Sequence, residues 1–329
     1  MTKRVEEEIK NFSESIKNLR NVMKVEELCE YGFLLRPFER EWEVTPPKSY
    51  ALCLFSLIHG NEVGGLAVLN EFLALLASGL IDCRISLVVA LGNPWAAKKG
   101  ERFLERDLNR SFGRSGPTWE EKRALALSPL LDNCMWFLDL HQTSQPSVTP
   151  FFIFPYSKEG LLFAENLSAS TPIVTHWDHG FSEDGMCSDE FVIEKGGVGI
   201  TLESGQSGFD NLQIGFGVKT ALQALHFVTS MLREDTPPHT PSPERRNIYI
   251  LKETVLCPQE GELKLNPGLI SFQKIEKGTL LGIHEGNNIV SPASGYLLFP
   301  NYNAERRPPH QRPMELMRII EEIDTSALP

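Results

Sequence analysis

The chain has 329 residues, more than one small domain needs, and its 41% hydrophobic and 23% charged residues are an ordinary globular composition. A formal net charge of −11 argues against a nucleic-acid backbone as partner. The first residues lack the apolar core of a signal peptide, and no segment approaches the ~18 apolar residues of a membrane span. The six cysteines are scattered without a C-x-x-C pair, so we expect buried free thiols in a cytoplasmic protein without a membrane partner.

The N-terminal segment, residues 4–24, repeats apolar side chains at spacings of three and four, beginning with Val5 and Ile9. This period predicts an amphipathic helix. We expect it to pack on its own domain, and a dimerisation helix, which would make the protein a homo-oligomer, is the alternative. We assign residues 1–45 to an N-terminal helical extension.

A different pattern begins near residue 50. Continuous apolar runs with little alternation are typical of strands buried on both faces of a sheet. Strands alternating with helices predict an α/β fold, with a mixed sheet covered by helices on both faces, over residues 46–234. The predicted strands are 50–58, 83–91, 135–140, 150–155, 172–177 and 196–203, and the predicted helices are 62–79, 120–133, 157–170 and 209–234.

The C-terminal part has a different texture. Residues 235–247 carry four prolines and no apolar pattern, which is typical of a linker. Short apolar runs broken by Gly, Pro and Asn follow, and they predict a small β domain over residues 248–329. We expect residues 314–323 to form a closing helix.

Polar side chains follow three of the predicted strands. His59 and Glu62 follow the first strand, His141 follows the strand 135–140, and Glu203 ends the strand 196–203. Ligands of open α/β sheets bind outside the carboxyl ends of the strands, so we expect these four side chains to converge. Two imidazoles and a carboxylate suit Zn²⁺ with one open position, and Glu203 is available as a base. H-x-x-E alone is common by chance, so the motif by itself leaves a surface turn open.

Other polar residues near these strands have weaker claims. His176 and His179 have the spacing of metal ligands, but the Gly- and Asp-rich residues around them favour a solvated loop. Asp139, two residues before His141, is either a partner of the metal site or an ordinary buried aspartate.

A charged segment, residues 92–113, follows the second buried strand. It contains Arg102, Asp107 and the adjacent pair Asn109 and Arg110. A guanidinium binds a carboxylate through two hydrogen bonds and an amide adds another donor, so this pair favours an anion-binding role over a solvated loop.

Together these motifs resemble the succinylglutamate desuccinylase/aspartoacylase family, which has a zinc carboxypeptidase-like fold. The matching segments, in the same order, are HGNE at 59–62, the run from Asn93 to Phe112 with its Asp-Leu-Asn-Arg core, DLH at 139–141, and the glutamate of TLESG at 201–205. The resemblance covers roughly residues 50–300, and the long arginine-containing segment is its most specific part.

The resemblance implies a role for each matching residue. It makes His59, Glu62 and His141 the ligands of one Zn²⁺ per chain. It makes Glu203 the general base and Arg102 the residue that polarises the scissile carbonyl. Asn109 and Arg110 would hold the α-carboxylate of the substrate.

The sequence departs from the family in its C-terminal part. Where the family has a tyrosine that helps to fix the substrate, this chain has Arg306 and Arg307, and Tyr302 nearby does not align well. We expect either that these arginines favour an acidic substrate or that they are solvated. The small β domain is expected to cover the zinc cleft.

The function that the resemblance implies is zinc-dependent hydrolysis of a small anionic N-acyl amino acid, such as an N-acetylaspartate-like or N-succinylglutamate-like compound. A metallocarboxypeptidase or ester hydrolase on the same scaffold is one alternative. A non-catalytic member that binds a ligand or partner is another, but the presence of all the motif residues disfavours it.

Overall fold

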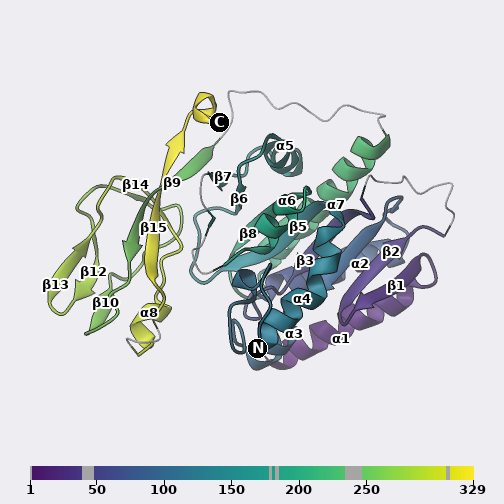
Figure 1. Ribbon diagram of the computed structural model, residues 1–329, viewed down its shortest axis with the longest axis horizontal. Helices are drawn as coiled ribbons and strands as arrows, with labels where there is room; N and C mark the ends of the chain where they lie inside the picture. The colour runs from purple at the N-terminus through teal and green to yellow at the C-terminus, as the bar shows by residue number, and fades with distance from the viewer. Residues whose placement is uncertain (1, 39–47, 178–179, 182–184, 234–246, 309–311) are drawn as a thin grey trace.

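The computed structural model describes residues 2–38, 48–177, 180–181, 185–233, 247–308 and 312–329 (Figure 1). Its centre is a mixed sheet of twelve strands in the order β1-β2-β4-β3-β5-β8-β6-β7-β9-β15-β14-β11. The strands are β1 Lys24–Cys29, β2 Gly32–Arg36, β3 Tyr50–Ser56, β4 Leu87–Leu91, β5 Cys134–Thr143, β6 Phe151–Pro155, β7 Ile173–His176, β8 Val198–Gln206, β9 Ile248–Leu256, β11 Lys274–Ile275, β14 Gly295–Leu298 and β15 Glu315–Ile323.

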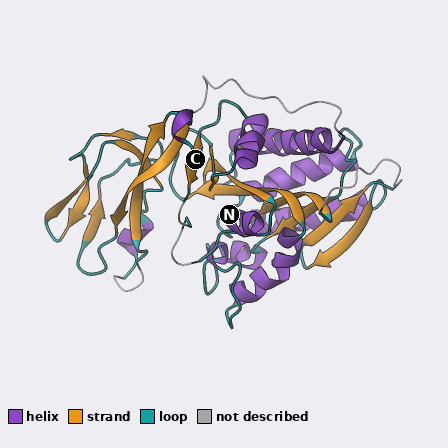
Figure 2. Cartoon of the chain, turned by 45° about the horizontal axis from the view of Figure 1, so that its top comes forward, coloured by secondary structure: helices purple, strands orange, loops and turns teal. Residues whose placement is uncertain are grey.

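Helices cover both faces of the N-terminal part of this sheet, and a second, three-stranded sheet lies in the C-terminal part (Figure 2). That sheet has the order β10-β12-β13, with β10 Leu263–Leu265, β12 Leu280–His284 and β13 Asn287–Val290. The helices are α1 Thr2–Leu19, α2 Gly64–Ala77, α3 Pro94–Lys99, α4 Trp119–Asp132, α5 Lys158–Leu167, α6 Ser188–Glu194, α7 Asn211–Arg233 and α8 Asn303–Arg306, with 3₁₀ turns at η2 Leu108–Arg110 and η5 Thr325–Ala327.

The alternation of side chains along β3 shows why both faces need helices. Leu52 and Leu54 belong to one buried cluster with α1, α2, α5 and α7, whereas Cys53 and Phe55 belong to another with α4 and α6. Successive residues of a strand point to opposite faces, so a continuous apolar run requires a cover on each side. The predicted α/β fold with a mixed, helix-covered sheet is confirmed.

Four central strands position the polar residues of the predicted site. β4, β3, β5 and β8 are mutually parallel, so their carboxyl ends lie at the same edge of the sheet. His59 follows β3, while His141 and Glu203 are register partners near the ends of β5 and β8. The parallel order therefore brings residues distant in sequence to one edge.

The N-terminal segment is helical only in its first half. The predicted amphipathic helix is α1, which buries Val5, Ile9 and Phe12 and packs on α2. The next residues form the antiparallel hairpin β1–β2, and β2 pairs with β4 to extend the main sheet. The expectation that residues 1–45 form a helical extension is thus wrong for residues 24–36, which form this hairpin. Residues 39–45 lie outside the described part. The described residues contain no helix long and apolar enough to cross a membrane.

Four strands of the C-terminal part, β9, β15, β14 and β11, continue the main sheet. β9 pairs in parallel with β7, and β15 pairs with β9 and β14. The expectation of a closing helix over 314–323 is wrong, because these residues form β15. Glu, Leu, Met and Arg favour a helix locally, but strand partners on both sides satisfy the backbone of this segment instead.

A cluster of apolar side chains joins the two parts of the chain. It contains Phe151, Val174, Tyr249, Phe272 and Ile320, which come from both sides of the predicted linker. Residues 235–246 of that predicted linker lie outside the described residues. The boundary between a hydrolase domain and a small β domain stays a prediction. The main sheet contains strands from both sides of this boundary.

Candidate metal centre and substrate site

The turn after β3 places His59 and Glu62 on one side of the backbone. The backbone crosses Ala96 and Ala97 so closely that a Cβ on Gly60 would lie 2.4 Å from the amide nitrogen of Ala97. Only glycine fits such a close approach. α2 then begins at Gly64, so the two side chains are held between a buried strand and a buried helix.

His59, Glu62 and His141 form one compact cluster. The carboxylate of Glu62 lies between the rings, with Oε1 2.8 Å from Nδ1 of His59 and Oε2 2.9 Å from Nδ1 of His141. One nitrogen or oxygen of each residue lies within 4.8 Å of the others, and all three residues are buried. Two nitrogens and an oxygen that face a common centre are a donor set for Zn²⁺.

The opposite nitrogen of each imidazole faces a second carboxylate. Nε2 of His59 lies 3.0 Å from Oδ1 of Asp107, and Nε2 of His141 lies 3.0 Å from Oδ2 of Asp139. Imidazoles that bind metals usually donate their other N–H to a carboxylate, which fixes the ring and raises its basicity. These aspartates therefore fit the metal site. Of the two roles that the sequence leaves open for Asp139, its position beside His141 favours that of a partner of the candidate metal site. The sequence does not predict the contact of Asp107 with His59.

Arg102 contacts the cluster and is more exposed than its other residues. Nη1 donates to Oε1 of Glu62 at 3.1 Å, Nε donates to Oδ2 of Asp107 at 3.2 Å, and Nη2 lies 2.7 Å from Nε2 of His59. Its side chain is 31% exposed, against 4% for that of Glu62. The guanidinium thus borders the candidate metal-binding cluster and is itself partly exposed to solvent.

Local charges decide the protonation of this cluster. Burial raises the pKa of Glu62, but His59 and His141 outweigh it and hold that pKa well below its usual range. Burial likewise opposes ionisation of Asp107, and His59 and Arg102 hold its pKa well below the ordinary value. Both carboxylates are therefore negative and suited to a cation.

Glu203 has the opposite character. Its side chain is buried beside His141, and Oε2 has no hydrogen-bond partner among the described residues. Burial and the negative charge of Glu62 raise the pKa of Glu203 to about 8. A divalent cation at the cluster would offset the charge of Glu62 and favour the ionised form of Glu203. A carboxylate tuned in this way is suited to accept and return a proton.

Asn109 and Arg110 lie in the 3₁₀ turn η2, next to the cluster. The backbone N–H of Asn109 donates to the Asp107 oxygen that faces His59, at 2.9 Å. Arg110 is partly buried, and Nη1 donates to the carbonyl of Asn109 at 2.6 Å and to Sγ of Cys187 at 2.9 Å. The structure thus brings the predicted carboxylate-binding pair into one hydrogen-bond network with the His59-Glu62-His141 cluster.

Ser188, the first residue of α6, joins the two halves of this network. Its backbone N–H donates to Oδ1 of Asn109 at 2.9 Å, and its hydroxyl donates to Oδ2 of Asp139 at 2.5 Å. Sequence reasoning missed this residue because an isolated serine carries no motif, and its partners lie 79 and 49 residues away.

Other residues considered from the sequence lie apart from the cluster. His176 is buried at the end of β7, so the solvated-loop interpretation is wrong for it, and His179 lies outside the described residues. The hydroxyl of Tyr302 donates to the carbonyl of Asn266, which is a contact within the C-terminal part. Arg306 and Arg307 are exposed at the end of α8.

A buried His-Glu-His cluster that could hold a metal ion thus lies at the carboxyl ends of the parallel strands of a mixed α/β sheet. The profile of the succinylglutamate desuccinylase/aspartoacylase catalytic domain matches residues 49–234. The chain belongs to this family.

Two named relatives show the extent of the similarity. Succinylglutamate desuccinylase of Serratia proteamaculans is 30% identical over 285 residues, covering 79% of this chain and 83% of the relative. The enzyme of the same name from Yersinia pestis is 25% identical over 283 residues, covering 78% and 82%.

Solved structures share the fold at low sequence identity. Succinylglutamate desuccinylase of Vibrio parahaemolyticus superposes with a TM-score of 0.69 at 16% identity, covering 92% of this chain and 89% of that one. Murine aminoacylase 3 superposes with a TM-score of 0.61 at 19% identity, covering 83% and 95%. At these identities the likeness concerns the fold alone.

Proposed function

We propose that this protein is a zinc-dependent amidohydrolase that cleaves a small N-acyl amino acid into a carboxylate and a free amino acid. The observation that carries the proposal is the buried cluster of His59, Glu62 and His141, with an aspartate behind each imidazole. The names of the relatives, desuccinylases and an aminoacylase, support the same reaction class. We assign one zinc ion per chain to this cluster.

The residues around the cluster divide the chemical work. A zinc ion bound there would supply Lewis acidity toward the attacking water and the amide carbonyl. Glu203 takes a proton from the water and returns it to the leaving amine. Arg102 donates hydrogen bonds to the oxygen on which negative charge develops, because its guanidinium borders the cluster on the accessible side.

Substrate recognition falls to Asn109 and Arg110. Asp107 connects this pair to the cluster, because its Oδ1 contacts both the backbone N–H of Asn109 and Nε2 of His59. A carboxylate bound by Asn109 and Arg110 would therefore lie beside the residues that we assign to the zinc ion. Burial lowers the pKa of the partly buried Arg110, but Cys187, Asp107 and Glu190 raise that pKa above its ordinary value, so the guanidinium is charged. A charged guanidinium held in this network favours substrates with a free α-carboxylate.

The proposal is tested with the zinc-loaded protein and a substrate panel. N-acetyl, N-succinyl and N-formyl amino acids are compared with the corresponding α-amides and with an ester, and release of the free amino acid is measured. We expect hydrolysis of at least one N-acyl amino acid and little hydrolysis of its α-amide. Faster cleavage of the ester or of the α-amide would reject this proposal.

A further inference from the structure

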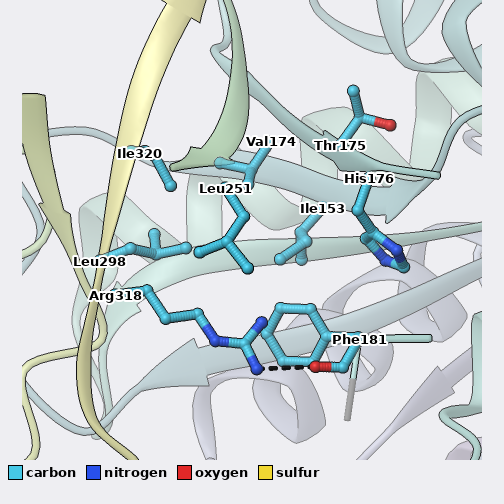
Figure 3. A pocket seen from close by; sticks show the side chains of 9 residues that line it. All are labelled: Ile153, Val174, Thr175, His176, Phe181, Leu251, Leu298, Arg318 and Ile320. Atoms are coloured by element: carbon cyan, nitrogen blue, oxygen red, sulfur yellow. Dashed lines mark hydrogen bonds between the residues drawn. The ribbon is translucent and has the colours of Figure 1, made fainter. Parts of the chain in front are cut away.

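An arginine from the last strand of the chain reaches the edge of the proposed substrate site. Arg318 lies on β15 and is buried. Its Nη2 donates to the carbonyl of Phe181 at 2.6 Å, and its guanidinium carbon lies 3.9 Å from the centre of the Phe181 ring (Figure 3). Residue 181 precedes α6, so this contact joins the end of the chain to a segment of the catalytic domain.

The orientation of Arg318 is fixed within its own strand. Both oxygens of Glu315 accept hydrogen bonds from its guanidinium, at 2.6 Å from Nε and 2.7 Å from Nη2. A two-point contact with a carboxylate restricts a guanidinium in position and in plane. Arg318 therefore presents a defined surface to Phe181.

Phe181 is held from the opposite side by α6. Its backbone N–H donates to Oε1 of Glu190 at 2.5 Å, and Oε2 of Glu190 accepts from the backbone N–H of Cys187 at 2.8 Å. Both polar groups of residue 181 thus have a partner, one in α6 and one in β15. The ring is fixed by its backbone as well as by its side-chain contacts.

The same ring contacts the residue that we assign to the substrate carboxylate. The guanidinium carbon of Arg110 lies 5.5 Å from the centre of the Phe181 ring, within range of a cation–π interaction. Two arginines on one ring would repel each other, but nearby carboxylates offset both positive charges. Glu315 accepts hydrogen bonds from Arg318, and the negative charges of Asp107 and Glu190 favour the charged form of Arg110. The arrangement is therefore electrostatically consistent.

We propose that Arg318 is a positioning residue for substrate binding: it holds the Phe181 ring against Arg110 and so fixes the guanidinium that binds the substrate carboxylate. The proposal rests on the proposed function, because it takes the role of Arg110 from it. It assigns the last strand of the chain a part in substrate affinity, and it assigns none in the chemical step.

The test compares two arginines of the C-terminal part, each of which donates hydrogen bonds to backbone carbonyls. Arg318→Lys keeps the charge but loses the planar fork. The matched control is Arg312→Lys, because the guanidinium of Arg312 donates to the carbonyls of Pro258, Glu260 and Gly261, at 2.9, 3.1 and 2.9 Å, all within the C-terminal part. The melting temperature and zinc content of both variants are measured beside their kinetics.

We expect Arg318→Lys to raise KM about tenfold with kcat within about twofold of the wild type and zinc content unchanged. Arg312→Lys should lower the melting temperature and leave KM unchanged. Phe181→Leu should raise KM as well, and the double variant with Arg318→Lys should raise it no further, since both changes disrupt one contact. Equal KM values for the two lysine variants would overturn the proposal.

A binding measurement separates this proposal from the proposed function. The affinity for N-succinylglutamate is measured by calorimetry in the Glu203→Gln background, where turnover is not needed. A weaker affinity with Arg318→Lys but not with Arg312→Lys supports the positioning role even if the wild type hydrolyses none of the panel. Unchanged affinity in both variants rejects it, whatever the wild type hydrolyses.

Discussion

At the scale of single residues, the candidate metal site depends on carboxylates as much as on imidazoles. Each ring lies between Glu62 on its Nδ1 side and an aspartate on its Nε2 side. Without Asp107 and Asp139, the rings would lose the contacts that fix their orientation. The aspartates are therefore expected to contribute to metal affinity without binding the metal.

Removing one of these aspartates tests that expectation. Asp139→Asn keeps the size of the side chain and removes its charge, so we expect zinc affinity to fall about 10–100-fold. Competition with a chelator of known affinity measures the change. Asp82→Asn is the control, because the Asp82 side chain is 62% exposed and pairs only with Arg84 in the described structure. Equal zinc affinity in both variants would contradict the assignment.

The ligands themselves make a stronger prediction. His59→Ala and His141→Ala each remove one of three donors, so elemental analysis should find less than about one tenth of the wild-type zinc. His176→Ala is the control, since His176 lies at the end of β7 and outside the cluster. Wild-type zinc content in either ligand variant would place the metal elsewhere.

Glu203 is expected to act on protons and not on the metal. Glu203→Gln keeps the shape of the side chain but cannot accept a proton, so kcat should fall about 10²–10⁴-fold with zinc content retained. Turnover and elemental analysis on the same preparation check both statements. Near wild-type turnover would make Glu203 a structural residue, despite its burial beside His141.

At the scale of elements, the first turn of α4 organises the segment that carries Arg102 and Arg110. The carboxylate of Glu120 is buried and accepts from the backbone N–H groups of residues 104–106, at 2.6, 3.1 and 3.1 Å. It also accepts from Nδ2 of Asn93 at 3.0 Å. One side chain thus accepts from four donors, of which Nδ2 of Asn93 is buried and the three backbone groups are partly buried.

This arrangement predicts a stability effect with a functional consequence. Glu120→Gln replaces one acceptor oxygen by an NH₂ group that faces backbone donors, so the free energy of unfolding should fall by about 2–3 kcal/mol. Glu121→Gln is the control, because Glu121 lies in the capping box of α4 with Thr118, and this change should lower the free energy of unfolding less than Glu120→Gln does. Urea unfolding measures both, and equal losses would show that Glu120 has no special role.

Much of the sheet could be predicted because its strands are apolar throughout. The runs at 50–58 and 135–140 are buried on both faces, which leaves little doubt about their conformation. The sequence does not predict the hairpin at 24–36, because β1 has no buried residue and three of its six residues are charged. Segment 314–323 was wrongly predicted as a helix, because its strand partners β9 and β14 are distant in sequence.

The site divides in a similar way. His59, Glu62 and His141 could be predicted to converge, since they follow strands that a parallel sheet aligns. The contacts of Asp107 with His59 and of Ser188 with Asp139 span 48 and 49 residues and depend on loop geometry. Residue spacing and motifs in the sequence do not predict such contacts.

At the scale of the whole molecule, the C-terminal part borders the catalytic domain close to the site. Val148, in the segment that follows the strand of His141, donates to the carbonyl of Ser271 at 3.0 Å. The Phe181 contact of Arg318 lies at a second point of the same border. Aromatic side chains also pack across this border, which we call the junction: the ring centres of Phe272 and Phe151 lie 5.0 Å apart. We therefore expect the C-terminal part to limit the length of the substrate.

The last prediction tests this limit with a series of substrates. The wild type should cleave an N-acyl amino acid at least about tenfold faster, in kcat/KM, than it trims a tripeptide, because a covered site excludes longer chains and water. Phe272→Ala removes the ring between Phe151 and Tyr249 and should cost about 3–5 kcal/mol of stability at the junction. A looser junction should reduce the preference for the short substrate. Leu281→Ala is the control, since Leu281 is fully buried in the C-terminal core away from the junction.

The two variants separate docking from stability. Loss of the length preference in Phe272→Ala but not in Leu281→Ala would show that the docked C-terminal part sets the limit. An equal loss in both would attribute the limit to the stability of that part alone. If the wild type trims tripeptides as fast as it cleaves any N-acyl amino acid, the site is open, and the carboxypeptidase alternative on this scaffold is correct.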